Sequence, residues 1–143
     1  MAAITFAVTL SVLWIAHHVA DHWIQTDCQA ITKGRPARDE AGTRDRSGQL
    51  ADLRHVLSLT AVLAAALLAV AWRVDIAYDP ARFVVALLVN GASHYWADRR
   101  VYLLRLARAI GKGGWLDNDP TAAYTLDQSW HLLWLLITAL IIV

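Results

Sequence analysis

Four histidines and three aspartates lie within or at the ends of apolar segments, and their spacing recurs along the chain. An ionisable side chain in a membrane-spanning segment costs about 2.5–3.5 kcal/mol on insertion scales, so it is rarely placed there without a partner or a task. Neutral imidazoles and carboxylates are ligands of Zn²⁺, Mn²⁺ and Fe²⁺. The pattern therefore predicts a centre for one or two divalent metal ions. The predicted ligands are His17, Asp21, His55, His94, Asp98, Asp127 and His131.

Six of these residues form His/Asp pairs four positions apart, so each pair presents a nitrogen and an oxygen donor on one helix face. A metal ion with an open coordination position lowers the pKa of bound water toward about 7 and polarises a phosphoryl or carbonyl oxygen. The chemistry that this predicts is hydrolysis of a phosphate-bearing or membrane-proximal substrate. A carboxylate could act there as general base, or could orient a ligand histidine. The candidates are Asp21, Asp98 and Asp127.

The segments that must position these residues are long and apolar. The hydrophobic share of the 143 residues is 57%, against about 45–50% in soluble proteins. A helix needs about 20 mainly apolar residues to cross a bilayer. We therefore expect one all-α membrane domain over residues 1–143, with four transmembrane helices at about 2–24, 54–73, 81–103 and 120–143. The seven Trp are typical of membrane interfaces.

The connecting segments are polar or amphipathic. Residues 27–52 are rich in Arg, Asp and Gly and predict a loop. Residues 99–110 carry Arg on one side and Leu or Ile on the other, which predicts an amphipathic extension at the lipid headgroups. The single cysteine, Cys28, excludes an intramolecular disulfide. A net charge of +1 argues against specific nucleic-acid binding.

The basic residues indicate an orientation. Eleven of the thirteen fall in the connections between the first and second spans and between the third and fourth spans. By the positive-inside rule these connections are cytoplasmic, which predicts a bacterial inner-membrane protein with both termini outside. In this topology all seven candidate ligands lie toward the cytoplasmic end of the bundle. Membrane lipids, and an anionic lipid or phosphate-bearing substrate, are the expected partners.

The two halves of the chain also resemble each other. His17-x-x-x-Asp21 precedes His55 by 38 positions, and His94-x-x-x-Asp98 precedes His131 by 37. This spacing predicts two parallel helix-pair repeats related by an axis along the membrane normal. In the first half Ala51 stands where the second half has Asp127. Asp52 is then the neighbouring carboxylate.

Two other functions use the same residues. In a metal or proton transporter they would form a transit site, which needs a second access route from the external side. In a non-catalytic membrane adaptor they would be hydrogen-bonded pairs that hold helices together. A metal-dependent hydrolase needs a cleft beside the centre, whereas the adaptor needs neither metal nor cleft.

The combined motifs resemble those of a known family. His17-x-x-x-Asp21-x-x-x-Gln25, His55, His94-x-x-x-Asp98 and Asp127-Gln128-x-x-His131 are similar to a domain of unknown function in bacterial and phage integral membrane proteins. More distantly, they are similar to proteins classed as membrane-bound metal-dependent hydrolases. The resemblance spans nearly the whole chain. It implies a compact helical membrane fold and places the metal ligands at the same seven positions.

Overall fold

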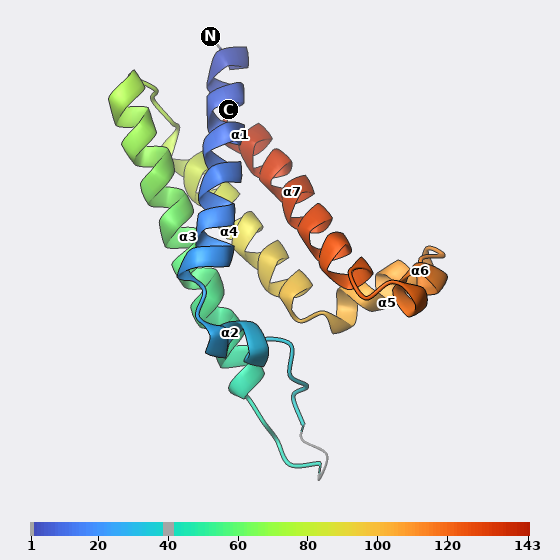
Figure 1. Ribbon diagram of the computed structural model, residues 1–143. Helices are drawn as coiled ribbons and strands as arrows, with labels where there is room; N and C mark the ends of the chain where they lie inside the picture. The colour runs from blue at the N-terminus through green and yellow to red at the C-terminus, as the bar shows by residue number, and fades with distance from the viewer. Residues whose placement is uncertain (1, 39–41) are drawn as a thin grey trace.

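The computed structural model describes residues 2–38 and 42–143, and within them the fold is all-helical. Four long helices form the body of the molecule, and Figure 1 shows α4 lying behind α1, between α3 and α7. They are α1 (Ala2–Val19), α3 (Ser47–Val74), α4 (Pro80–Asp98) and α7 (Ala122–Ile142). The two ends of the chain lie at the same end of this bundle (Figure 1).

Three helical segments are long and apolar enough to cross a membrane. They are Ala2–Ile24, Ser47–Val74 and Ala122–Ile142. This finding indicates a membrane protein. The fourth expected span, α4, does not meet the same criterion, because Arg82, Asn90, His94 and Asp98 lower its mean hydropathy.

Short helices gather at the end of the bundle opposite the termini (Figure 1). They are η1 (Ala20–Ile24), α2 (Asp27–Thr32), α5 (Val101–Ala109) and α6 (Gly113–Asn118). Thr26 caps α2. Its hydroxyl accepts a hydrogen bond from Gln29 N, and its backbone N–H donates one to Gln29 Oε1. Asp45 accepts from the backbone N–H and the hydroxyl of Ser47 at the start of α3. These two bonds hold the pKa of Asp45 below its ordinary value.

The segment predicted as a loop over 27–52 is therefore partly helical. It contains α2, and α3 begins at Ser47, seven residues before the expected start of the second span. Residues 39–41 of this segment lie outside the described residues. At about 1.5 Å per residue the 28 residues of α3 extend about 42 Å, more than a bilayer core of about 30 Å. The early turns of α3 consequently belong to the polar end of the molecule.

The third span does not continue into the amphipathic extension. Its helix, α4, ends at Asp98, and α5 begins at Val101 after a sharp turn. Arg100 has φ 55°, and Val101 N donates to Arg99 O at 2.5 Å across it, a three-residue turn that is rare for a residue with a side chain. As expected, α5 is amphipathic: Leu103 and Ala107 are buried and its arginines are exposed.

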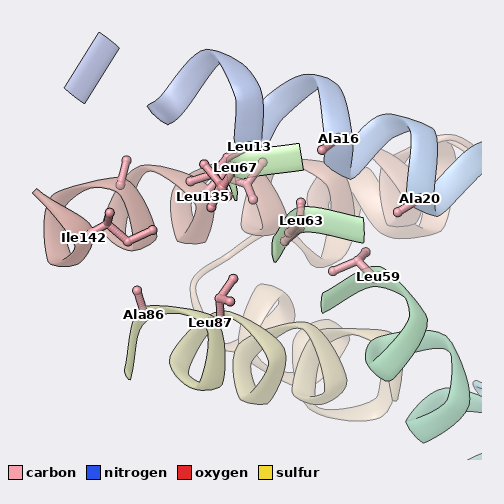
Figure 2. Packing of buried hydrophobic residues seen from close by; sticks show 11 residues of the cluster. Leu13, Ala16, Ala20, Leu59, Leu63, Leu67, Ala86, Leu87, Leu135 and Ile142 are labelled. Atoms are coloured by element: carbon pink, nitrogen blue, oxygen red, sulfur yellow. The ribbon is translucent and has the colours of Figure 1, made fainter. Parts of the chain in front are cut away.

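The apolar core fills the half of the bundle that lies toward the termini. In Figure 2, Leu13 of α1, Leu67 of α3 and Leu135 of α7 meet at its centre, while Ala86 and Leu87 of α4 lie at its edge. Apart from Ala20, the core residues lie on the terminus side of the predicted ligands on each helix: Leu13 precedes His17, for example, and Leu135 follows His131. The His/Asp residues and the apolar core thus occupy successive levels of one bundle.

Candidate metal centre

Five helical elements bring the predicted ligands together at the polar end of the bundle. His17 lies in the last turn of α1, and Asp21 lies in η1, which follows α1 directly. The other helices contribute His55 from α3, His94 and Asp98 from α4, and Asp127 and His131 from α7. Within this group, His55, His94, Asp98 and His131 have at most 2% of their surface exposed. Burial of so many ionisable groups in one place requires that they satisfy one another or bind an ion.

Three donor atoms form the tightest part of the centre. His55 Nε2 lies 3.1 Å from His94 Nε2 and 3.5 Å from Asp98 Oδ2, and His94 Nε2 lies 3.3 Å from the same oxygen. Tetrahedral Zn²⁺ has ligand distances of about 2.0–2.2 Å, which separate adjacent donors by about 3.3–3.6 Å. The observed triangle has the dimensions of one face of such a coordination shell.

Asp21 provides a fourth donor to this triangle. Its Oδ1 is 3.1 Å from His55 Nε2, and the donors of Asp21, His55 and His94 all lie within 4.8 Å of one another. Gln128 Nε2 donates to Asp21 Oδ2 at 3.1 Å and so fixes the carboxylate.

The helix geometry around Asp21 explains why it faces α3. Asp21 lies in η1, a turn of π-helix in which Gln25 N donates to Ala20 O. This wider turn rotates Asp21 away from the position that α-helical spacing gives it relative to His17. Within the described residues Asp21 contacts His55 rather than His17. The other two pairs are seen as expected, with Nε2–carboxylate distances of 3.3 Å for His94–Asp98 and 3.5 Å for Asp127–His131.

A second donor group lies beside the first. His131 Nε2 is 3.7 Å from Asp98 Oδ1 and 3.5 Å from Asp127 Oδ2. The His131 ring stacks on the His94 ring at 3.9 Å between centroids, with 17° between the planes. The His17 ring completes the group, with its centroid 5.2 Å from that of His131.

Several buried polar atoms of the centre have no hydrogen-bond partner among the described residues. An unsatisfied buried polar group costs about 1–3 kcal/mol. Pairs that served only to hold helices together would be satisfied, so these atoms favour a bound ion. Among the predicted ligands, the atoms are both ring nitrogens of His17, His55 Nδ1, His131 Nε2, and one carboxylate oxygen each of Asp21, Asp98 and Asp127.

Lys33 is a member of the centre that the sequence did not reveal. Its Nζ donates to Asp98 Oδ2 at 2.9 Å and lies 3.8 Å from Asp21 Oδ1. Only 6% of this residue is exposed. Lys33 follows α2 in a segment predicted as a loop, where a lysine ordinarily indicates a solvated surface. No spacing pattern links it to the helices.

Two further charged residues, Arg99 and Asp52, lie near the centre. The Arg99 guanidinium donates to the backbone carbonyls of Lys33 and Arg35. It therefore ties the end of α4 to the segment after α2. Asp52 is fully buried and neither of its oxygens has a partner among the described residues. Its proximity to the centre was expected from the comparison of the two halves, although it joins neither donor group.

A cleft of about 370 Å³, with both polar and apolar lining residues, lies next to Arg99. It is lined by Tyr95 and Arg99, which directly follow His94 and Asp98 in the chain, and by Gln49, Tyr102 and Arg105. The cleft runs from the beginning of α3 to α5, and two of its residues are arginines. Arginine recognises carboxylates and phosphates through its planar set of donors.

Comparison with known proteins adds a family but no activity. No curated protein and no solved structure matches the chain. The family described as "Protein of unknown function (DUF3307)" matches residues 8–143, which include all seven predicted ligands and Lys33. The resemblance drawn from the motifs is thereby confirmed at the level of a domain of unknown function. The chain belongs to the DUF3307 family.

Proposed function

We propose that this protein is a membrane-embedded, metal-dependent hydrolase that acts on a phosphate-bearing substrate at the membrane surface. The observation that carries the proposal is the triangle of His55 Nε2, His94 Nε2 and Asp98 Oδ2, with sides of 3.1, 3.5 and 3.3 Å. Zn²⁺, Mn²⁺ and Fe²⁺ all fit a mixed set of imidazole and carboxylate donors. The similarity to membrane-bound metal-dependent hydrolases, suggested by the motifs alone, stays a prediction.

A bound divalent cation would supply a Lewis acid and a water molecule of lowered pKa. The residues of the chain hold and shield that chemistry. His55, His94 and Asp98 present their donors on one side, and Asp21 is steadied by Gln128. In the hydrolysis, the water oxygen bonds to phosphorus, the ester P–O bond breaks, and a proton from water passes to the leaving alkoxide. Asp21 and Asp127 are the carboxylates placed to receive a proton in transit.

For the membrane topology, we propose that α4 is a fourth crossing of a bacterial inner membrane. It packs between α3 and α7, so its polar residues face other helices and its apolar side faces lipid. The basic segments after α2 and around α5 would then be cytoplasmic, with both termini outside. The packing of α1 on α3 and of α4 on α7 supports the two parallel repeats.

The cleft beside the centre supports the choice of substrate. Arg105 gives it an exposed positive charge, and Arg99, which is bonded to backbone carbonyls, adds a buried one. The helix α5 would lie at the depth of the lipid headgroups. An anionic group bound there would lie beside Arg99, the residue that follows Asp98 in the sequence. A lipid phosphate and the phosphate of a soluble ester share this chemistry.

Transport is favoured less by the structure. Beyond the centre, toward the termini, the bundle is closed by Leu13, Leu63, Leu67 and Leu135, whose exposed fractions are 0–1%. A transported ion or proton needs a polar route through that layer. Thr9, with Tyr78, and Asn90, with Thr138, are polar groups there, and each side chain is bonded to the other member of its pair.

The metal content of the purified protein tests the proposal first. We expect stoichiometric divalent metal in the detergent-solubilised protein by elemental analysis, and its loss in His55→Ala and His94→Ala. His22→Ala is the matched control, because His22 is exposed and bonds to Tyr124 outside the centre. Folded parent protein without metal, even after incubation with Zn²⁺ or Mn²⁺, would contradict the metal centre and favour the adaptor function.

Hydrolysis is tested with model phosphate esters. We expect metal-loaded protein to hydrolyse p-nitrophenyl phosphate or bis(p-nitrophenyl) phosphate and a chelator to abolish the reaction. His94→Ala should lower the rate by more than the roughly 10–100-fold lost when a group that only supports a ligand is removed. Metal binding without hydrolysis of any phosphate ester would contradict the enzymatic part of the proposal.

A further inference from the structure

The two oxygens of Asp98 face different groups of donors. Oδ2 is the oxygen near His55 and His94, at 3.5 and 3.3 Å from their Nε2 atoms, and it also accepts a hydrogen bond from Lys33 Nζ at 2.9 Å. Oδ1 is the oxygen near His131, at 3.7 Å from Nε2, and it has no hydrogen-bond partner among the described residues. The Asp98 side chain is 1% exposed, so solvent does not account for the second oxygen. A carboxylate placed in this way has one oxygen for each of two neighbouring cations.

The second group contains enough donors for an ion of its own. His131 Nε2 lies between Asp98 Oδ1 and Asp127 Oδ2, at 3.7 and 3.5 Å, without a hydrogen bond to either. These separations are those of donors that share a metal ion, not of hydrogen-bonded groups. Both ring nitrogens of His17, a residue 1% exposed, are unpartnered beside His131.

The stacking of His94 on His131 agrees with two adjacent ions. The two rings are nearly parallel, with 17° between their planes and 3.9 Å between their centroids. Each Nε2 approaches a different oxygen of Asp98. The two stacked imidazoles therefore direct their Nε2 atoms toward two adjacent positions, one at each oxygen of the Asp98 carboxylate.

We propose that the centre is a two-metal site bridged by Asp98. Asp21, His55 and His94 complete one ion's ligands, and His17, Asp127 and His131 complete the other's. This inference rests on the proposed function, which needs one metal ion, and adds a second ion to the same centre. Paired divalent ions about 3.5–4 Å apart are typical of phosphatases, nucleases and aminopeptidases. With an arginine-lined cleft beside it, the site is suited to phosphate esters or anhydrides.

Metal counting separates this inference from the proposed function. The full-length protein in detergent is stripped with chelator, reloaded with Mn²⁺ and analysed for metal per chain. We expect two ions in the parent and in His22→Ala, and one in Asp127→Asn and in His131→Ala. One ion in the parent would overturn the second site while leaving the metal-dependent hydrolase in place. No ion would overturn both.

The electron paramagnetic resonance spectrum of the Mn²⁺-loaded protein tests the bridge independently of activity. Two ions that share the Asp98 carboxylate are expected to give a spin-coupled spectrum, and Asp127→Asn is expected to give the spectrum of an isolated Mn²⁺. Two ions without coupling would contradict bridging by Asp98. Thermal unfolding of each variant verifies that it is folded; Asp127, whose side chain is 14% exposed, is the substitution least able to disturb packing.

Discussion

The Lys33 ammonium is the fixed positive charge of the centre. It donates to Asp98 Oδ2 at 2.9 Å, lies 3.8 Å from Asp21 Oδ1, and comes from a short segment that Arg99 holds by its backbone. Two buried carboxylates without a cation would repel each other at considerable cost. The same ammonium must weaken the binding of a divalent ion, since like charges at short range oppose each other in a medium of low dielectric constant. In the proposed metal centre, Lys33 would therefore stabilise the metal-free protein and lower its affinity for metal.

Replacing Lys33 by Met should separate these two effects. We expect metal-free Lys33→Met to lose about 3–5 kcal/mol of stability, the range measured when one partner of a buried ion pair is removed. Added Zn²⁺ or Mn²⁺ should raise its unfolding temperature more than that of the parent, because the freed carboxylates bind the ion without competition. Thermal unfolding in detergent with and without metal measures both.

Lys112, an exposed residue, provides the control for this substitution. Lys112→Met should unfold like the parent at every metal concentration. An equal metal-induced shift in Lys33→Met and in the parent would show that Lys33 and the ion do not share the carboxylates.

At the scale of the helices, the start of α3 is fitted closely against the segment after α2. A Cβ on Gly48 would lie 2.7 Å from Arg35 O and 3.0 Å from both Thr32 O and Arg99 Nη1. Two of these three atoms belong to backbone, which cannot move aside cheaply. The close approach at Gly48 thus holds α2, Lys33 and Arg99 in place around the centre.

Gly48→Ala should therefore disturb the centre from a distance. We expect the substitution to displace the segment that carries Lys33, to lower the unfolding temperature, and to increase proteolysis within residues 33–46. Gly114→Ala in α6 is the matched control, since a Cβ there meets nothing within 4 Å. If Gly48→Ala proved as stable and as resistant to protease as Gly114→Ala, the close contact at Gly48 would not be needed to hold the segment.

The elements show what the sequence could and could not predict. Spacing of four residues placed Asp98 with His94 and His131 with Asp127 correctly, because a regular α-helix fixes which residues share a face. The π-helical turn at Asp21 and the turn at Arg100 have no such local signal. They arise from contacts with distant residues, such as the bonds from Arg99 to the segment after α2. Lys33 could not be predicted for the same reason.

At the scale of the whole molecule, polarity is distributed along the axis of the bundle. Toward the termini the helices bury leucines and alanines, and toward the other end they bury histidines, aspartates and Lys33. The short helices and the basic connection between α2 and α3 lie beyond that polar end (Figure 1). An arrangement of this kind has one end suited to the membrane interior and one end suited to a polar interface.

The single cysteine allows a direct test of orientation. Cys28 is exposed on α2, at the end of the molecule opposite the termini. If the basic connections are cytoplasmic, a membrane-impermeant maleimide should leave Cys28 unmodified in spheroplasts and modify it after permeabilisation, with the mass of the purified protein as readout. In a Cys28→Ser background, Ala3→Cys at the exposed start of α1 should react in intact spheroplasts. Modification of Cys28 alone from outside would invert the orientation, and the metal centre would then open away from the cytoplasm. Modification of both positions from outside would mean that α1 does not cross the membrane, because its two ends would lie on the same side.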